Sequence, residues 1–208
     1  GYDATDTTYT IRGKKSVTVT DGNFTLQNGQ FNFTLTSVNG APMPDGVAGS
    51  QTVSNVGEDF TFGTINFTAP GTYQYQVKEN SENPITGISY DGSTYDVSIQ
   101  VDDQNGTLNV TNVSITKDSV PAELRFTNTY TPEDITLGED GNAALGGTKT
   151  VTPTPGNTFE LKDNQFNFTL SPVNGAPMPD GVVGSQTVSN TGSSFAFGNI
   201  TYTHTGEY

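Results

Sequence analysis

Lys15, Glu79 and Asn128 are polar residues at positions where the surrounding sequence alternates like a β-strand and requires an apolar side chain. Successive side chains of a strand point to opposite faces, so residues two apart share a face. In TYQYQVKEN, Glu79 shares its face with two tyrosines and a valine. In PAELRFTNTY, Asn128 shares its face with a leucine, a phenylalanine and a tyrosine. In GKKSVTV, Lys15 shares its face with two valines, whereas Lys14 faces the other way. The alternation predicts an amine, an acid and a carboxamide that all point inward.

These three groups are the reagents of one covalent reaction. An unpaired charge is costly to bury, so a buried lysine and a buried glutamate shift their pKa values toward the neutral forms. A neutral amine can attack the amide carbon while the acid polarises the carbonyl and moves protons, and ammonia leaves. The predicted product is an intramolecular isopeptide bond between Lys15 and Asn128, with Glu79 as catalytic acid and no metal or cofactor. The bond forms once per molecule, so we predict no enzyme with turnover.

Each of the three residues also has an ordinary structural interpretation. Lys15 could be an edge lysine whose stem lies along the core while its amine reaches water. Glu79 could be an exposed acid where a strand bends into NSENP, and Asn128 could be an asparagine next to a turn. The occurrence of all three together, and an internal repeat, favour the reactive interpretation.

The chain repeats part of itself, and the repeat distinguishes between neighbouring lysines. Gln30–Tyr73 and Gln165–Tyr208 align without gaps and are identical at 31 of 44 positions. Upstream, GKKSVTVTDGN matches GTKTVTPTPGN once one residue is inserted between this segment and the glutamine that begins the longer match. This alignment pairs Lys15 with Lys149 and the outward lysine with a threonine. The copy keeps the inward lysine, so Lys15 is the predicted reacting residue and Lys149 is the crosslink lysine of the second repeat.

The repeat divides the chain into a complete domain, residues 1–131, and a partial one, residues 148–208. The polar, acidic and glycine-containing segment between them, residues 132–147, is typical of a linker. Residues 1–11 are expected to be a leading strand or the tail of a preceding unit. The second copy lacks counterparts of the acid and the amide. We expect further sequence of a longer protein to complete it or, less favoured, a strand from another chain.

The composition and the turn signals indicate an all-β fold. Threonine, asparagine, valine, tyrosine and phenylalanine favour strands and turns, and no long stretch of helix formers occurs. Short alternating segments bounded by turn signals such as Asn39-Gly40 and Asn105-Gly106 are candidate strands. These segments are 15–20, 30–38, 50–54, 59–67, 71–79, 94–102, 107–116 and 122–130. Such a series favours tandem Ig-like β-sandwich domains with Greek-key connections, the second one incomplete.

Charge and composition exclude several classes of partner. The formal net charge of −14 argues against binding to nucleic acid and against docking to an anionic membrane. No apolar run approaches the roughly 18 residues of a membrane span, so no membrane insertion is expected. The chain has no cysteine, so neither disulfides nor thiolate chemistry is available. A secreted β-protein without disulfides needs another source of stability, which the predicted bond would supply.

Other motifs carry weaker signals. VDDQNG could bind calcium through Asp102, Asp103 and Asn105, but calcium takes six to eight oxygen ligands and a plain acidic hairpin fits better, so no metal site is predicted. His204, the one histidine of the chain, pairs with an alanine of the first copy and is interpreted as structural or incidental. No Ser-His-Asp set and no phosphate-binding loop is present.

Five pieces of sequence occur in one order: the early Lys15, QFNFTL, GTYQYQVKEN with Glu79, ISYDGSTYDVSIQV, and FTNTY with Asn128. Together they resemble the isopeptide-linkage domains of Gram-positive pilins and surface adhesins, and in particular the repeat type of the streptococcal major pilin. The resemblance covers residues 13–131 and, as a partial second copy, residues 147–208. It implies that Lys15 and Asn128 become covalently joined and that Glu79 is the catalytic acid.

The resemblance and the predicted bond together favour a structural role. We expect a stalk or shaft module of an extracellular fibre on the cell surface, whose partners are neighbouring repeats or subunits. The near-identical copies favour a repetitive adhesin over a polymerised pilin, and this choice stays open. The alternative is a ligand-binding adhesin domain for carbohydrate or matrix protein, with the repeated loop SVNGAPMPDG as its candidate surface. A hydrolase with paired carboxylates is a third hypothesis, against which the scattered acids argue.

Overall fold

A computed structural model describes residues 3–208, so the first two residues of the segment 1–11 lie outside the described part of the chain. The chain separates into two compact units, Gly1–Thr131 and Pro132–Tyr208. Throughout residues 3–208 the regular elements are strands, which confirms the predicted all-β class.

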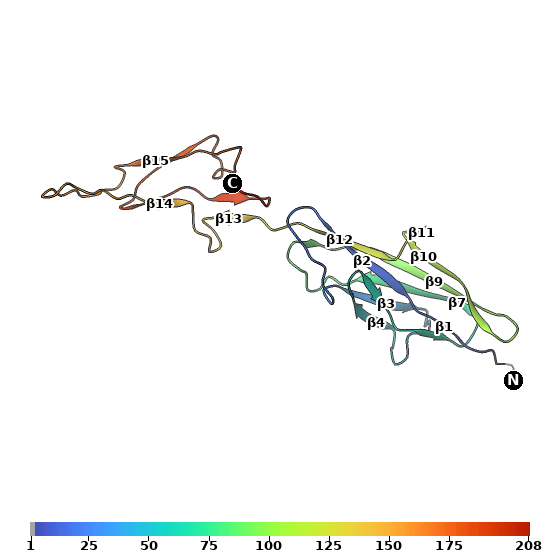
Figure 1. The fold of residues 1–208 in the computed structure, drawn as a ribbon. Coiled ribbons are helices and arrows are strands. Elements are labelled where there is room, and N and C mark those ends of the chain that lie inside the picture. Colours follow the sequence, from blue (N-terminus) through green and yellow to red (C-terminus); the bar gives the residue numbers. More distant parts are fainter. Residues whose placement is uncertain (1–2) are drawn as a thin grey trace. The chain divides into compact units, whose positions relative to one another are not determined.

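The first unit is a sandwich of two main sheets, and two further strands of the unit form a separate pair (Figure 1). Its strands are β1 (Thr7–Tyr9), β2 (Arg12–Val19), β3 (Asn32–Val38), β4 (Ser50–Ser54), β5 (Asp59–Thr61), β6 (Ile65–Phe67), β7 (Gly71–Glu79), β8 (Ile88–Ser89), β9 (Thr94–Asp103), β10 (Leu108–Lys117), β11 (Val120–Pro121) and β12 (Arg125–Tyr130). A six-stranded sheet has the order β11-β10-β9-β7-β3-β4, and a four-stranded sheet has the order β5-β2-β12-β8. β1 pairs with β6, so residues 1–11 contribute a leading strand.

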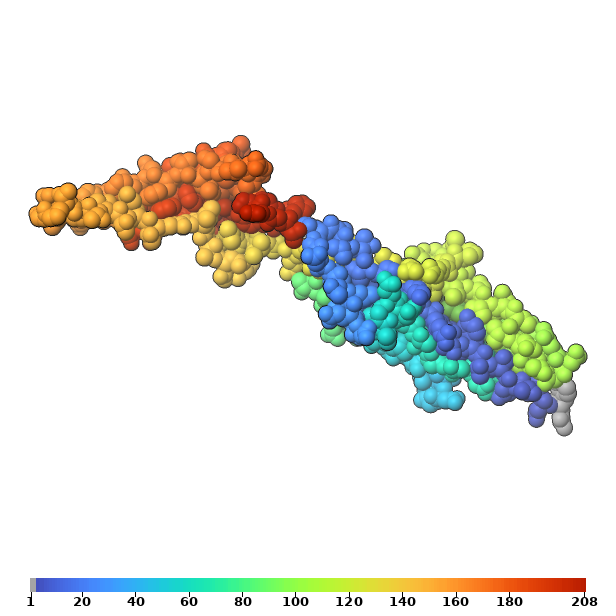
Figure 2. Space-filling model, in the orientation of Figure 1, coloured from blue at the N-terminus to red at the C-terminus, as the bar shows by residue number. Residues whose placement is uncertain are grey.

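The pairing of β2 with β12 places the beginning of the first unit beside its end. The two strands are parallel, with Phe126 opposite Lys15 and Asn128 opposite Val17. In the space-filling view, the blue residues of the first strands and the yellow residues that end this unit lie against each other (Figure 2). Strands far apart in the sequence are therefore neighbours in the four-stranded sheet.

Aromatic side chains fill the space between the two sheets. Phe33 of β3 stacks on Phe60 of β5 with 3.8 Å between ring centroids, and Phe126 of β12 lies 5.5 Å from Phe33. All three rings are buried, and such contacts add to the free energy gained by burying apolar area. Gly13 of β2 lies under Phe60, where a β-carbon would stand 2.1 Å from the ring. The ring needs a glycine there, two residues before Lys15.

The prediction of one strand over residues 59–67 is wrong. The segment forms β5, which pairs with β2, and β6, which pairs with β1. Between them Gly63 donates its backbone N–H to the side chain of Gln51 at 2.8 Å, and a β-carbon there would lie 2.7 Å from Pro44. Because Gly63 has no β-carbon, the chain can pass this close to Pro44 as it leaves the four-stranded sheet after β5 and pairs with β1 as β6. The hydrogen bond to Gln51 satisfies the Gly63 N–H at this crossing.

The second unit contains three pairs of strands: β13 (Ile135–Leu137) with β18 (Ile200–Tyr202), β14 (Gly146–Thr148) with β17 (Ser194–Ala196), and β15 (Asn167–Leu170) with β16 (Gln186–Ser189). The segment 132–147, expected to be a linker, contains β13 and the start of β14. β13 is three residues long, too short for alternation to reveal. Phe168 stacks on Phe195 at 3.8 Å, which repeats the packing of Phe33 on Phe60.

Candidate functional site

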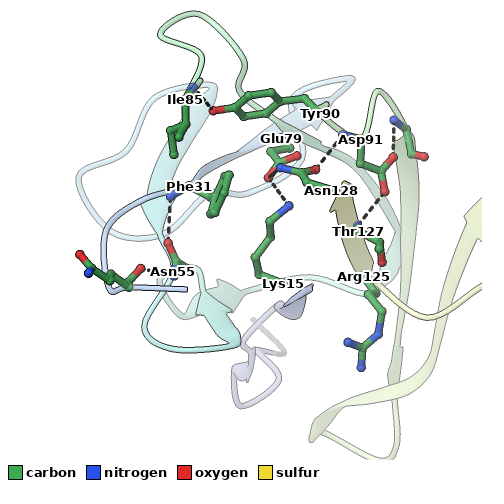
Figure 3. Close-up of polar contacts among 12 residues, drawn as sticks. Lys15, Phe31, Asn55, Glu79, Ile85, Tyr90, Asp91, Arg125, Thr127 and Asn128 are labelled. Carbon is green, nitrogen blue, oxygen red and sulfur yellow. Dashed lines mark hydrogen bonds and ion pairs between the residues drawn. The ribbon is translucent and has the colours of Figure 1, made fainter. Parts of the chain in front are cut away.

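Lys15, Glu79 and Asn128 meet inside the first unit (Figure 3). Lys15 lies on β2 and Asn128 on β12, which are neighbours in the four-stranded sheet, and Glu79 ends β7 of the six-stranded sheet. The side chains of Lys15 and Glu79 are 0% exposed, and Asn128 as a residue is also 0% exposed. The strand alternation therefore predicts the inward orientation of all three side chains correctly.

A single oxygen of Glu79 contacts both other groups. Lys15 Nζ lies 2.6 Å from Glu79 Oε1, and Asn128 Nδ2 donates a hydrogen bond to the same oxygen at 3.0 Å. The other oxygen, Oε2, is buried and has no hydrogen-bonding partner among residues 3–208. Asn128 Oδ1 accepts a hydrogen bond from the backbone N–H of Asp91 at 2.8 Å. The acid thus faces the amide nitrogen, whereas sequence analysis expects it to face the carbonyl.

The environment favours neutral forms of the amine and the acid. Burial lowers the pKa of Lys15, against the opposing effects of its contact with Glu79 and the charge of Asp91. Burial likewise raises the pKa of Glu79, opposed by Lys15 and Asn128 and assisted by the negative charge of Asp91. Desolvation is the largest cause in both cases, because a charge loses its hydration when it leaves water. A neutral amine is a nucleophile, and a protonated carboxyl can transfer a proton.

An aromatic ring and a buried asparagine complete the surroundings of the lysine. Lys15 Nζ lies 4.5 Å from the centroid of the Phe31 ring. Phe31 donates its backbone N–H to Asn55 Oδ1 at 2.9 Å, and Asn55 Nδ2 donates to the carbonyl oxygens of Gln27 and Gly57, both at 2.9 Å. Asn55 is 1% exposed, so these bonds are made away from water. They hold the backbone of Phe31 beneath the amine.

Comparison with known proteins identifies the family. The family model FctA, described as the Spy0128-like isopeptide containing domain, matches residues 11–131. The chain belongs to this family. The match confirms the resemblance drawn from the five sequence pieces, and it spans the unit that contains Lys15, Glu79 and Asn128.

Solved structures of pilins also resemble the chain. The major pilin from Streptococcus pyogenes has a TM-score of 0.46 and 19% identity, over 94% of this chain and 77% of the pilin chain. The T-13 major pilin from Streptococcus pyogenes has a TM-score of 0.47 and 19% identity, over 97% of this chain and 79% of the pilin chain. No curated protein matches the chain.

The second unit repeats the lysine's surroundings in this FctA family member. Lys149 Nζ lies 4.6 Å from the Phe166 ring centroid, as Lys15 does from Phe31. Lys149 donates its backbone N–H to Ser193 O at 2.7 Å, matching the bond from Lys15 to Glu58 O at 2.8 Å. Lys149 is half-buried, and its role as a crosslink lysine stays a prediction.

Sequence reasoning missed four residues that shape the site. Three of them carried a signal, because Gly13, Phe31 and Asn55 each align with an identical residue in the second copy: Gly147, Phe166 and Asn190. Asn190 makes the same set of hydrogen bonds as Asn55, to Phe166 N, Lys162 O and Gly192 O. The fourth, Asp91, lies within the piece ISYDGSTYDVSIQV and has no counterpart in the second copy.

The weaker motifs form no second site in the described residues. The carboxylate of Asp102 accepts hydrogen bonds from Gln100 and Thr111, and residues 3–208 contain no cluster of three or more metal-binding side chains. His204 is exposed, and its backbone carbonyl accepts a hydrogen bond from Tyr208 at 2.9 Å. Within the same range, no helix is long and apolar enough to cross a membrane.

The repeated loop SVNGAPMPDG is folded onto its own sheet. Ala41 and Pro44 are buried, and Tyr75 donates its hydroxyl hydrogen to Pro42 O at 2.5 Å. A loop fixed by such contacts has a structural reason to recur in both copies, so its repetition does not favour a ligand surface.

Proposed function

We propose that this chain is a structural module of a fibre on the surface of a Gram-positive bacterium, and that a covalent bond between Lys15 and Asn128 closes its first unit. The observation that carries the proposal is the contact of Lys15 Nζ and Asn128 Nδ2 with one buried oxygen, Glu79 Oε1. Membership of an isopeptide containing domain family supports the same role.

The reaction is an exchange of one amine for another at the carboxamide of Asn128. Neutral Lys15 Nζ attacks Cγ, a C–N bond forms, and the carbonyl electron pair moves to Oδ1. Glu79 relays a proton from Nζ to Nδ2, the Cγ–Nδ2 bond breaks as the carbonyl reforms, and ammonia leaves. The atoms and charges balance without another reactant, and Glu79 ends as it began. A positioned acid with a raised pKa suits this relay at neutral pH.

The proposed bond would join two strands that carry a pulling force applied to the ends of the first unit. Within the four-stranded sheet, β2 is the first strand in the sequence and β12 is the last. These two strands lie side by side. A pulling force on the ends loads these two strands, and a covalent bond between them transmits that force without opening the sandwich. The proposed partners are neighbouring repeats or subunits of the same extracellular fibre. The single reaction per molecule makes this a structural protein without turnover.

The deciding experiment is the intact mass of the full chain under denaturing conditions. We expect a deficit of one ammonia relative to the sequence, and tryptic peptides of the first unit joined through Lys15 and Asn128. The variant Glu79→Ala should fold and keep its full mass. Glu82→Ala, which removes an exposed acid from the same part of the chain, should lose ammonia like the wild type.

A wild-type chain with its full mass would overturn the proposed crosslink. Loss of ammonia from Glu79→Ala at the wild-type rate would instead overturn the catalytic role of Glu79 while leaving the bond in place.

A further inference from the structure

The two ends of the Asn128 carboxamide have different partners. Nδ2 faces Glu79, and Oδ1 accepts the backbone N–H of Asp91 at 2.8 Å (Figure 3). Attack by Lys15 would place negative charge on Oδ1, and the group already aimed at that atom is a backbone donor. Preorganised donors at the atom where charge develops are among the largest contributions to catalysis of acyl transfer.

The side chain of Asp91 explains why its own N–H points at the amide. Asp91 Oδ2 accepts the backbone N–H of Thr127 at 2.9 Å, and Oδ1 accepts the N–H of Ser93 at 3.0 Å. The last paired residues of β8 and β12 are Ser89 and Thr129. The Asp91 carboxylate therefore binds β12 two residues beyond the end of this pairing, at Thr127. This attachment fixes residue 91 beside Asn128.

The charge state of Asp91 agrees with this anchoring role. Burial alone would raise the pKa of Asp91, but the hydrogen bonds from Ser93 and Thr127 outweigh it and lower the pKa. The group is therefore an ionised carboxylate at neutral pH, and hydrogen bonds to an ionised acceptor are stronger than those to a neutral one. An ionised Asp91 is a firm anchor for the loop, and it is not itself a proton donor for the reaction.

We propose that the backbone N–H of Asp91 stabilises the oxyanion formed at Asn128 Oδ1 during the crosslinking reaction, and that the Asp91 carboxylate is the positioning group that holds this N–H in place. The inference rests on the proposed Lys15–Asn128 bond and assigns a second component to its chemistry. In the step, Nζ bonds to Cγ, the oxyanion accepts the Asp91 N–H, and collapse of the oxyanion expels Nδ2 as ammonia with the proton relayed by Glu79.

The same two partners also fit the product. The isopeptide amide has one N–H, which can donate to Glu79 Oε1, and one carbonyl oxygen, which keeps the Asp91 N–H. Both polar atoms of the new amide are thus satisfied in a buried site, where an unpaired polar group costs about 1–3 kcal/mol.

Three substitutions separate the parts of the proposal. Asp91→Pro removes both the N–H and the carboxylate, Asp91→Ala removes only the carboxylate, and Asp91→Asn keeps one oxygen that can accept the Thr127 N–H. We expect the crosslinking rate of Asp91→Pro to be about 100-fold or more below that of the wild type, the effect of removing an oxyanion donor. The rate of Asp91→Ala should lie between those of Asp91→Pro and the wild type. The rate of Asp91→Asn should stay within a few-fold of the wild-type rate.

The measurement is the rate of ammonia loss from the full chain. Each chain is synthesised in a cell-free system, samples are quenched in denaturant at intervals, and the fraction that has lost ammonia is read from the intact mass. Asp96→Ala, which removes an exposed carboxylate from β9 of the same unit, is the matched control and should react at the wild-type rate. Circular dichroism of each Asp91 substitution in a Glu79→Gln background checks that the uncrosslinked chain folds.

The outcomes distinguish this inference from the proposed function. A wild-type chain that never loses ammonia overturns both. A reactive wild type with an unchanged rate for folded Asp91→Pro overturns the oxyanion role alone. If Asp91→Pro does not fold, Asp91→Ala decides: a wild-type rate in this variant contradicts the positioning role. Asp91→Asn as slow as Asp91→Ala would mean that an oxygen able to accept the Thr127 N–H does not hold the Asp91 N–H in place, which also contradicts the inference.

Discussion

Lys15 and Asn128 lie on adjacent parallel strands, and the terminal nitrogens of both side chains contact Glu79 Oε1, at 2.6 and 3.0 Å respectively. Parallel neighbours in one sheet cannot come from a tight hairpin, because their connection must cross the sandwich. Here that connection is nearly the whole first unit. A bond between these two side chains therefore joins β2, the second strand of the domain, to β12, its last strand.

The first prediction compares adjacent lysines. Lys15→Ala should abolish ammonia loss, because its amine is the buried nucleophile. Lys14→Ala should leave the loss unchanged, because the Lys14 side chain is 46% exposed and pairs with Asp59 on the surface. Intact mass under denaturing conditions measures both. Abolished crosslinking in Lys14→Ala, with Lys15→Ala still reactive, would reverse the assignment made from the strand alternation and from the repeat.

The second prediction concerns the stability that the bond adds to the first unit. In the chain-entropy model, closing a loop of about a hundred residues contributes about 4–5 kcal/mol. Asn128→Ala should therefore unfold roughly 10–25 °C below the crosslinked wild type in a thermal melt. Asn112→Ala, which changes an exposed asparagine on β10, is the control and should melt close to the wild type. Equal melting temperatures for Asn128→Ala and the wild type would contradict a covalent closure.

The third prediction tests the burial of Glu79 through pH. Burial raises the pKa of Glu79 above its ordinary value of 4.5, and Lys15 opposes this rise. Lys15→Met removes the opposing group and also prevents crosslinking. A raised folded-state pKa means that the folded chain holds the proton more tightly. The stability from Glu79 is therefore present below the unfolded pKa and is lost as pH rises through the folded one.

The measurement is urea unfolding of Lys15→Met and of Lys15→Met/Glu79→Gln between about pH 4 and pH 8. The difference between the two unfolding free energies isolates Glu79 from the many other carboxylates of the chain. We expect the single variant to lose stability relative to the double variant as pH rises. If the difference in unfolding free energy stays constant, or if the single variant gains stability relative to the double variant as pH rises, the pKa of Glu79 is not raised in the folded chain.

The fourth prediction concerns Asn55, which no crosslinking step uses. Asn55→Ala leaves the N–H of Phe31 and the carbonyl oxygens of Gln27 and Gly57 without their buried partner, and should cost about 2–4 kcal/mol of unfolding free energy. Denaturant unfolding in the uncrosslinked Glu79→Ala background measures this cost without the covalent bond. A loss below about 0.5 kcal/mol, the usual size of a surface substitution, would mean that water replaces these bonds.

The inward orientation of Lys15, Glu79 and Asn128 could be predicted from the sequence because it depends on a local rule. Side chains two apart in a strand share a face, and neighbouring aromatic and aliphatic residues identify that face as the core. The internal repeat added a comparison within the chain that singled out Lys15. It could also have identified Phe31 and Asn55, since both recur at the same spacing. These features were present in the amino-acid sequence alone.

Tertiary structure decided which atoms meet. Glu79 ends β7 in one sheet while Asn128 lies on β12 in the other, and the orientation of the carboxamide depends on the N–H that Asp91 offers. That N–H is placed by a side chain bound to the backbone of Thr127, a contact between segments far apart in the sequence. Such long-range hydrogen bonds follow no periodicity. The sequence by itself determined that Lys15, Glu79 and Asn128 point inward, and the packing of the two sheets decided which atom of the amide faces the acid.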